Sequence, residues 1–398
     1  MKKLLAYLAG GLACLGAGAA FYIALSAAAP TRAVSDVIPA QAGIQKPLDT
    51  AIGFLDSRVR GNDKRGENDD RSDGNGAGDQ SGPMFQGDVS GFLGADNSTN
   101  APRNDTILFM GDIMLGRNVA VQMKKNSNDY PFAKIKDTVM AANYAIANLE
   151  GPLTKINNAP SNNMRFHFDP ALTPVLAAAG FDAFSLANNH GLDQGAKGES
   201  DTQAKLTAAR LAYFGDVSSD DGLVLNFVID DRKFAVIGLH DVYRKIDAKA
   251  VGEQIASLKK DGDIVIVYPH WGDEYQHKHN ARQAELAHAF VDAGADAVIG
   301  SHPHVIEGAE IYKGKPIFYS LGNLVFDQYF SADTQQGLAL RLNVDSTGLS
   351  SIDLLPYEIP LSQPAFADGD KKAKMLQDIA SWSDPSLKDQ IEAGKITL

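Results

Sequence analysis

Short apolar runs that end in polar clusters recur through the C-terminal three quarters of the chain. Each run is too short for a helix and stops at glycine or polar residues, as a buried strand does. Carboxylate, amide or imidazole side chains follow directly. These runs with their polar ends occupy residues 106–112, 145–150, 182–190, 264–274 and 296–304. A further run, 316–320, precedes Asn323 and Asp327 in the same way.

Helical patterns separate these runs. They lie near 131–143 and over 171–179, 194–211, 247–260 and 281–293, and Gly294 closes the last. Strands that alternate with helices predict an α/β fold with a largely parallel sheet. Two strand pairs lack an intervening helix and are predicted to be antiparallel. They are 224–230 with 233–239, and 337–344 with 351–355. We expect these pairs to form a second sheet packed on the first.

The polar clusters should meet in space, because ligands gather beyond the carboxyl ends of the strands in parallel sheets. The residues expected to converge beyond these strand ends are Asp112, Glu150, Asn189, His270, His302 and His304. Pro303 is expected to hold the chain extended between the two neighbouring histidines, so that both imidazoles point the same way. A single His-x-His is weak evidence of a metal site, and its weight here comes from the recurrence upstream.

Oxygen and imidazole groups without a thiolate suit Mn, Fe, Zn or Mg. Six such ligands exceed what one tetrahedral zinc requires, so two divalent metal ions are predicted. A pair of metal ions can activate a water molecule and stabilise transition-state charge. His190 would then be free to act as a catalytic acid or to bind the developing anion. Arg117 is placed to hold a phosphate or carboxylate.

Each of these residues also has an ordinary structural interpretation. Asp, Glu and Asn at strand ends also serve as helix caps, and a histidine can be structural. An exposed Arg117 could form only a surface ion pair. Asp193, Asn323 and Asp327 are expected to orient neighbouring loops rather than to bind metal. Trp271 and Tyr275 could equally belong to the core or to a cleft wall.

The N-terminal hundred residues differ in kind. Residues 4–29 contain no charged side chain and follow Lys2 and Lys3. This predicts an uncleaved signal anchor over 1–32, with a cleaved signal and lipidation at Cys14 as alternatives. Residues 33–105 have few clustered aliphatic side chains and are predicted to be a disordered linker. The remaining chain would be exported. The one cysteine, Cys14, lies inside the apolar stretch, so the exported domain would have no disulfide.

The formal net charge of the chain is −12. This argues against nonspecific binding to nucleic acid or to an anionic membrane surface. It does not exclude a local cationic pocket.

Six motifs, in order, together resemble the poly-γ-glutamate capsule-synthesis CapA family, a branch of the calcineurin-like metallophosphoesterases. They occupy residues 111–117, 148–152, 187–195, 270–275, 300–305 and 319–323. The similarity covers about 106–357 and implies a four-layer αββα sandwich with a dinuclear metal centre. We therefore expect a metallophosphoesterase-type domain over 106–360 and a C-terminal helical extension over 361–398.

The chain departs from the wider superfamily in its first two motifs. Met114 stands where the superfamily has a histidine, and Glu150 stands where it usually has an aspartate. The CapA branch shares both changes, which leave the occupancy of one metal site and ordinary phosphatase activity open. Glu307 also stands where the branch often has glutamine.

Two classes of function follow. The first is a membrane-anchored, exported metal-dependent hydrolase that acts on a phosphoester or on the γ-glutamyl amide of an anionic polymer. The second is a non-catalytic scaffold or polymer-binding component of capsule synthesis or export. In both cases the expected location is the cytoplasmic membrane, with the folded domain outside it. Other capsule-synthesis subunits are possible partners, and nucleic acid is not expected to be one.

Overall fold

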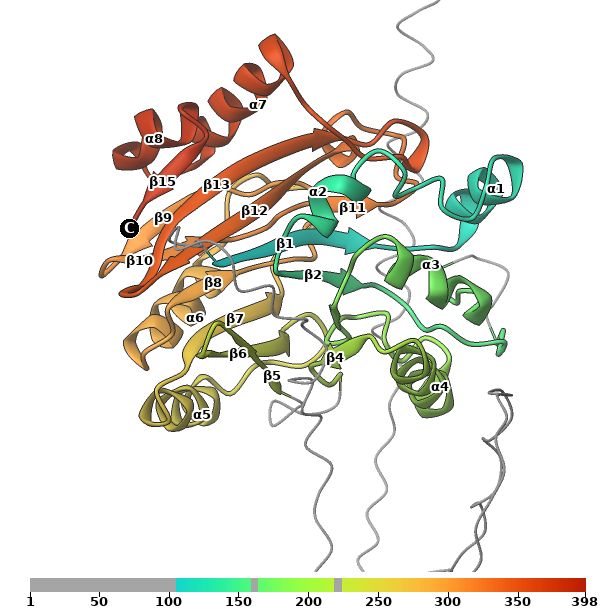
Figure 1. The fold of residues 1–398 in the computed structure, drawn as a ribbon, viewed down its shortest axis with the longest axis horizontal. Coiled ribbons are helices and arrows are strands. Elements are labelled where there is room, and N and C mark those ends of the chain that lie inside the picture. Colours follow the sequence, from blue (N-terminus) through green and yellow to red (C-terminus); the bar gives the residue numbers. More distant parts are fainter. Residues whose placement is uncertain (1–104, 159–163, 218–223) are drawn as a thin grey trace, which may run out of the picture. The chain divides into compact units, whose positions relative to one another are not determined.

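The computed structural model describes residues 105–158, 164–217 and 224–398 (Figure 1). The predicted signal anchor and almost all of the predicted linker lie outside the described residues. Within the described ranges, no helix has both the length and the apolar character needed to cross a membrane.

The described residues form a mixed α/β fold with two β-sheets. The first sheet has nine strands, with the order β14-β13-β12-β1-β2-β3-β4; β11 also pairs with β1, and β15 with β13. Its strands are β1 (Asp105–Ile113), β2 (Tyr144–Leu149), β3 (Ala183–Ser185), β4 (Ala212–Phe214), β11 (Asn323–Val325), β12 (Gln336–Asp345), β13 (Gly348–Glu358), β14 (Ala365–Phe366) and β15 (Lys395–Thr397).

The second sheet has six strands in the order β5-β6-β7-β8-β10-β9. Its strands are β5 (Val224–Ile229), β6 (Arg232–His240), β7 (Ile264–His270), β8 (Ala297–Ile299), β9 (Ala309–Tyr312) and β10 (Lys315–Phe318). The parallel pairs β6–β7, β7–β8 and β8–β10 lie at its centre. Each predicted apolar run therefore contains a strand, although β3 is shorter than its run and β13 extends three residues beyond the predicted 351–355 at each end.

The expected division of strands between the two sheets is wrong. The strands with polar ends do not share one sheet, because β1 to β3 belong to the first sheet and β7 and β8 to the second. The two antiparallel pairs do not form a sheet of their own either. Instead, β6 pairs parallel with β7, and β12 pairs antiparallel with β1. The inner strand of each pair, β6 or β12, thus forms backbone hydrogen bonds along both of its edges.

Eight α-helices complete the described part of the fold. They are α1 (Arg117–Lys125), α2 (Lys136–Met140), α3 (Thr173–Ala178), α4 (Gly195–Ala208), α5 (Ala248–Lys260), α6 (Ala281–Asp292), α7 (Gly369–Trp382) and α8 (Lys388–Glu392). The local sequence explains their ends. Asn280 and Gln283 form a capping box at the start of α6, and Gly294, with φ +113°, follows its last turn as predicted. The pattern near 131–143 yields only the short α2.

The core has three apolar layers. One cluster joins the inner faces of the two sheets and includes Phe109 of β1 and Tyr268 of β7. A second lies between the first sheet and α1 to α4, and a third between the second sheet and α5 and α6. Helices α1 to α6 therefore cover the outer faces of two stacked sheets (Figure 1). This arrangement lets residues that follow strands of different sheets meet at one edge.

The segment after residue 360 is not purely helical. It contains α7 and α8, and it also contributes β14 and β15 to the first sheet. Apolar residues of both helices, including Ile379 and Ile391, pack with Leu342 and Leu354 on the inner face of that sheet. The segment therefore completes the interior next to β12 and β13.

Candidate metal centre and adjoining cavity

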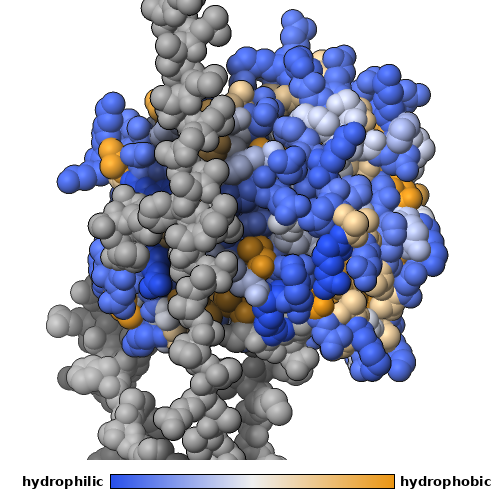
Figure 2. Space-filling view, turned by 180° about the vertical axis from the view of Figure 1, so that it is seen from behind, coloured by the Kyte–Doolittle hydropathy of each residue, from blue (hydrophilic) through white to orange (hydrophobic). Residues whose placement is uncertain are grey.

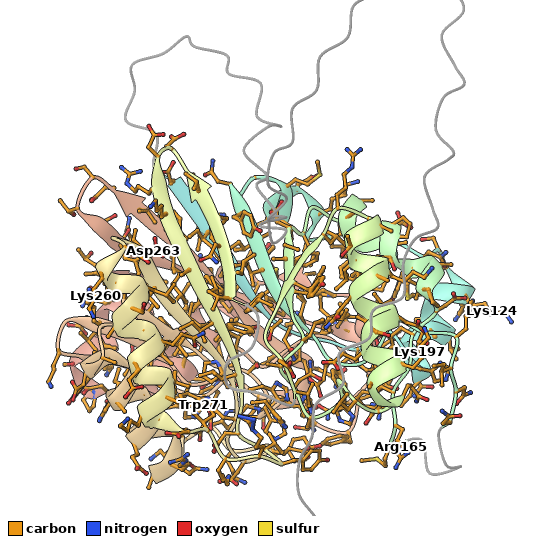
Figure 3. All side chains as sticks on the ribbon, turned by 90° about the horizontal axis from the view of Figure 1, so that it is seen from below. Lys124, Arg165, Lys197, Lys260, Asp263 and Trp271 are labelled. Carbon is orange, nitrogen blue, oxygen red and sulfur yellow. The ribbon has the colours of Figure 1, made fainter. Side chains whose placement is uncertain are left out.

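Both sheets deliver polar residues to one site. Asp112 lies near the end of β1, opposite Asn148 of β2 and Asn323 of β11. Glu150 follows β2 directly. In the second sheet His270 is the last residue of β7. Figure 3 shows the two ends of β7, where Asp263 precedes the strand and Trp271 follows His270.

A close backbone contact fixes the position of Asp112. Its N–H donates to the Gly322 carbonyl over 3.1 Å. A Cβ atom at Gly111 would lie 1.9 Å from the same oxygen, so only glycine fits there. Gly322 itself has φ +71°. The glycines in these two motifs thus allow the strands to approach closely at the site.

The carboxylates of Asp112 and Glu150 are fully buried. Asp112 accepts from Asn148 Nδ2 over 2.8 Å and from the His302 N–H over 3.2 Å. Burial raises the pKa of Asp112 to about 7. Burial, with the Asp112 carboxylate nearby, raises the pKa of Glu150 well above its usual value. Neither Glu150 oxygen has a hydrogen-bond partner among the described residues. Such groups are costly to bury unless a cation balances them.

Three buried imidazoles face these carboxylates. The ring centroids of His270 and His302 lie 4.8 Å apart, and those of His302 and His304 lie 5.9 Å apart. His304 Nε2 lies 3.6 Å from Glu150 Oε1. Burial lowers the pKa of His302 and of His304 to about 3, and that of His270 well below its usual value. All three rings are therefore neutral near pH 7, which is the form that binds metal.

The backbone between the two neighbouring histidines is not extended. His302 has φ +102° and His304 has φ +60°, so the expectation that Pro303 keeps this stretch extended is wrong. Both values are uncommon for residues other than glycine and persist only where the surroundings impose them. Neighbouring contacts do so here: the His302 N–H is held by Asp112, and His304 Nδ1 lies 3.0 Å from Asn323 Oδ1.

The donor atoms fit metal ions. Two groups each place three donors within 4.8 Å of one another: Asp112, Glu150 and His270, and Glu274, His302 and His304. Glu150 and His304 connect the two groups. The buried Glu150 oxygens and His302 Nδ1 have no hydrogen-bond partner in the described structure, as expected for atoms that ligate a cation. Oxygen and imidazole donors without thiolate suit Mn, Fe, Zn or Mg. The groups are consistent with the predicted metal dependence.

Asn189 lies next to the first group. Its Oδ1 is 2.8 Å from His270 Nε2. The other ring nitrogen, Nδ1, lies 3.0 Å from Ser301 Oγ. Asn189 is thus placed where a ligand was predicted. The hydroxyl of Ser301 can orient the imidazole from behind.

His190 stands beside the carboxylates with a partner on each ring nitrogen. Its Nδ1 lies 2.7 Å from Asp193 Oδ2, and its Nε2 lies 3.8 Å from Glu150 Oε1. Its ring stacks on Phe166 at 3.9 Å between centroids. Asp193 also accepts from the Phe166 N–H. The aspartate therefore orients the His190 ring, holds the backbone of Phe166 and leaves Nε2 of His190 directed at the site.

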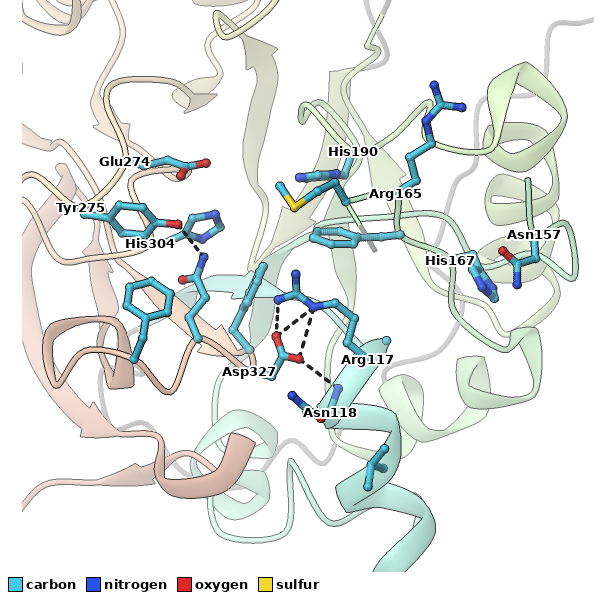
Figure 4. A pocket seen from close by; sticks show the side chains of 17 residues that line it. Arg117, Asn118, Asn157, Arg165, His167, His190, Glu274, Tyr275, His304 and Asp327 are labelled. Atoms are coloured by element: carbon cyan, nitrogen blue, oxygen red, sulfur yellow. Dashed lines mark hydrogen bonds and ion pairs between the residues drawn. The ribbon is translucent and has the colours of Figure 1, made fainter. Parts of the chain in front are cut away.

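Arg117 is held by Asp327. The guanidinium donates to both carboxylate oxygens, and the N–H of Asn118 donates to Oδ2 over 2.9 Å. The guanidinium carbon also lies 5.0 Å from the Phe166 ring centre and 5.6 Å from that of Phe326. Figure 4 shows the bonds of Asp327 to Arg117 and Asn118 among the side chains that line a cavity. Arg117 is thus positioned rigidly, with φ +49° at the start of α1.

The cavity has a volume of about 760 Å³ and opens beside the metal-binding groups. Its lining includes Arg117, His190, Glu274 and His304. A volume of this size is typical of small-molecule sites. It connects the predicted catalytic residues with the second donor group.

The structure brings all the predicted site residues together, while their roles stay predictions. Asp193, Asn323 and Asp327 contact other polar side chains, as expected of orienting residues. Sequence reasoning missed Glu274, although it lies in the motif that begins at His270. It also missed the two buried asparagines: Asn188 donates to Asn148, which in turn donates to Asp112. Asn148 and Asn188 lie in the polar clusters that end the runs 145–150 and 182–190, and this position could have identified them as site residues.

Comparisons with known proteins agree with the motifs. The family model for bacterial capsule synthesis proteins, PGA_cap, matches residues 106–328. The PGA biosynthesis protein CapA of Bacillus subtilis (strain 168) is 31% identical over 309 residues, which cover 73% of this chain and 80% of that protein. The capsule biosynthesis protein CapA of Bacillus anthracis is 34% identical over 284 residues, which cover 65% of this chain and 68% of that protein.

Among solved structures, a hypothetical protein from Thermus thermophilus matches with a TM-score of 0.43 and 16% identity, covering 64% of this chain and 100% of that one. This similarity is too weak to support an argument. The family model, by contrast, matches more than half of the chain. The resemblance predicted from the motifs is confirmed, and the chain belongs to the bacterial capsule synthesis protein family PGA_cap, the CapA family.

Proposed function

We propose that this protein is a membrane-anchored, exported metal-dependent hydrolase of the CapA type that acts in the synthesis, processing or export of a poly-γ-glutamate capsule. The names of its relatives, PGA biosynthesis protein CapA and capsule biosynthesis protein CapA, support the link to this polymer. The observation that carries the hydrolase part is the meeting of two buried carboxylates with three buried, neutral imidazoles beside a cavity. In fold terms, the proposal is a four-layer αββα sandwich of the metallophosphoesterase type.

Two divalent ions would be held by the two donor groups and by Asn189. When bound, such ions supply a water molecule of lowered pKa and positive charge for the transition state. The two buried carboxylates need positive charge nearby to ionise at neutral pH, because burial raises the pKa values of Asp112 and Glu150. Cations at these carboxylates would favour their ionised forms.

The remaining residues would act on the substrate. Hydrolysis joins the oxygen of water to phosphorus or to a carbonyl carbon and breaks the P–O or C–N bond. The departing oxygen or nitrogen then needs a proton. His190 Nε2 faces the site while Asp193 holds the other ring nitrogen, so His190 is placed to donate that proton. Arg117, fixed by Asp327, would hold an anionic group of the substrate.

One observation favours the alternative, a non-catalytic scaffold or polymer-binding component of the capsule machinery. Met114 occupies the motif position at which the wider superfamily has a histidine. Its side chain is fully buried, and its Sδ accepts from the Gly116 N–H over 3.0 Å. The site thus has one imidazole fewer than that superfamily. Such a site could bind metal or polymer without turnover.

The proposed location is the cytoplasmic membrane, with a single span near the N-terminus and the folded domain outside. The uncharged stretch 4–29 after Lys2 and Lys3 supports it. Proteinase added to intact spheroplasts should digest the folded domain. Full protection of that domain in intact spheroplasts, with digestion only after lysis, would contradict the orientation.

A substrate screen tests the hydrolase. The purified full-length chain, loaded separately with Mn²⁺, Zn²⁺ and Mg²⁺, is assayed on simple phosphoesters and on γ-glutamyl peptides. Turnover with at least one metal, lost in the presence of a chelator and restored by adding the metal, is the expected result. Metal binding without turnover of any of these substrates would favour the non-catalytic alternative.

A further inference from the structure

The exposed lining of the cavity is half polar and half apolar, and its polar members are Asn118, Asn157, Arg165 and Glu274. Four of its lining side chains are large, apolar and exposed: Phe330 by 69%, Met164 by 62%, Val121 by 58% and Tyr275 by 42%. They come from four separate segments of the chain. The ring centroids of Tyr275 and Phe330 lie 5.4 Å apart. Long-range folding has thus gathered these side chains around one opening.

Such a cluster is informative because single exposed apolar residues are ordinary, whereas a contiguous group beside a cleft marks a binding surface. Elsewhere in the described structure, large exposed apolar residues such as Val228 and Tyr243 lie outside the cavity. On the face in Figure 2, hydrophobic residues appear as small patches among hydrophilic ones. These four side chains, the apolar rim, therefore favour an occupant with apolar surface.

The charges in the cavity do not match a polyanion. The charge of Arg117 is partly offset by Asp327, and Glu274 adds a negative charge to the lining. Two arginines line the cavity, Arg117 and Arg165. Arg165 has no ion pair to a carboxylate among the described residues. A groove for a chain of carboxylates would instead present a row of unpaired cations. At the inner end of the cavity the lining includes two buried imidazoles, those of His190 and His304.

We propose that this cavity binds an amphipathic phosphoester, with its phosphate at the inner, metal-binding end and a hydrocarbon chain along the rim formed by Val121, Met164, Tyr275 and Phe330. This inference rests on the proposed function, because the phosphate needs the metal centre. It narrows the substrate class from any phosphoester or γ-glutamyl amide to phosphoesters of apolar alcohols. Hydrolysis by water would release the alcohol and phosphate, with the alkoxide oxygen taking its proton from His190.

Alkylphosphonates test this binding mode, because their P–C bond is not an ester and binding can be measured without turnover. The full-length chain loaded with Mn²⁺ is titrated calorimetrically with butylphosphonate and octylphosphonate below their micelle concentrations. Each methylene buried against the rim should lower Kd by about two- to fourfold. Octylphosphonate should therefore bind at least about tenfold more tightly than butylphosphonate.

Rim variants locate the chain. Val121→Ser and Phe330→Ser should each reduce the butyl-to-octyl ratio of Kd values by about threefold or more, because each removes apolar surface along the chain. Val228→Ser is the matched control. Val228 on β5 is 57% exposed, close to Val121, but it does not line the cavity. This control should leave the ratio unchanged.

Equal affinities for the two phosphonates, or no binding of either, would overturn the inference. So would a butyl-to-octyl ratio of Kd values that is unchanged by both rim substitutions. A γ-glutamyl oligomer that displaces octylphosphonate, and whose affinity depends on Phe330, would overturn it as well. Octyl phosphate is assayed for hydrolysis in parallel. Binding that depends on the rim, without hydrolysis of octyl phosphate, would support the binding proposal and count against the proposed hydrolase function. The two proposals can therefore fail separately.

Discussion

Glu307 offers a sharp test of how burial controls ionisation beside the site. Its side chain is 1% exposed, and Oε2 accepts from Gln283 Nε2 over 2.7 Å. Oε1 has no hydrogen-bond partner among the described residues. Burial raises the pKa of Glu307 from 4.5 to about 8, aided by the Asp273 carboxylate and opposed by the bond from Gln283. The native protein therefore binds this proton more tightly than the unfolded chain.

The sign follows from linkage. Below about pH 4.5 both states hold the proton, so Glu307 adds no pH dependence there. As the pH rises toward 8 the unfolded chain releases the proton first, and native stability falls. One pKa unit corresponds to about 1.4 kcal/mol, so the full loss above pH 8 is at most roughly 5 kcal/mol. Relaxation around the charged group should make the actual loss of folding stability smaller, between about 2 and 5 kcal/mol.

Glu307→Gln removes the titration while keeping size and hydrogen-bonding groups. The variant should unfold at a temperature about 4 °C or more above wild type at pH 9, with this difference shrinking steadily toward pH 5. Thermal unfolding followed by circular dichroism at pH 5, 7 and 9 measures it. Glu285→Gln, at a side chain that is 71% exposed, is the control and should show a flat difference. A Glu307→Gln difference that is also flat across this range would refute the reasoning.

Three further predictions concern other parts of the molecule. His190→Asn should keep metal content near that of wild type and lower turnover by about 10² to 10⁴, as measured by metal analysis and steady-state kinetics; loss of metal would instead make His190 a ligand. Arg117→Ala should destabilise the fold by about 1 to 2 kcal/mol, because Asp327 would be left buried without its cation, and Arg117→Ala with Asp327→Ala should recover part of this in urea unfolding; additive losses would show that the pair is not coupled. Removal of residues 1–104 should change the melting temperature by less than about 2 °C, since the predicted linker from residue 33 has few clustered aliphatic side chains to contribute to packing and the predicted anchor would lie in the membrane; a much lower melting temperature would show that the removed part packs on the domain.

The sequence predicted which residues meet at the site better than it predicted how the strands divide between the two sheets. Asp112, His270 and His302 could be identified because apolar runs that end in polar residues are local signals, and the structure brings these residues together. The helix ends were similarly local, as at Gly294. What a run of apolar residues does not encode is which sheet it joins. That depends on backbone pairing between distant segments, such as Asp112 with Asn323.

The details of the site required the three-dimensional fold for the same reason. The positive φ values of His302 and His304 are imposed by Asp112 and Asn323, which come from elsewhere in the chain. Nothing near Phe166 in the sequence indicates that its ring stacks on His190. The apolar rim is also invisible in the sequence, because its four side chains come from one helix and three separate loops.

The central claim is that the buried carboxylates and imidazoles bind divalent metal ions, and metal content measures it most directly. Purified full-length protein, dialysed against Mn²⁺ or Zn²⁺ and then freed of excess metal, should retain about two ions per chain by mass spectrometry. His304→Ala should retain fewer and melt at a lower temperature, because metal that binds only the folded state stabilises it. His288→Ala, at a histidine paired with Glu310 outside both donor groups, should retain as much metal as wild type. A wild-type chain that holds no metal under any of these conditions, or a His304→Ala variant that holds as much as wild type, would contradict the account.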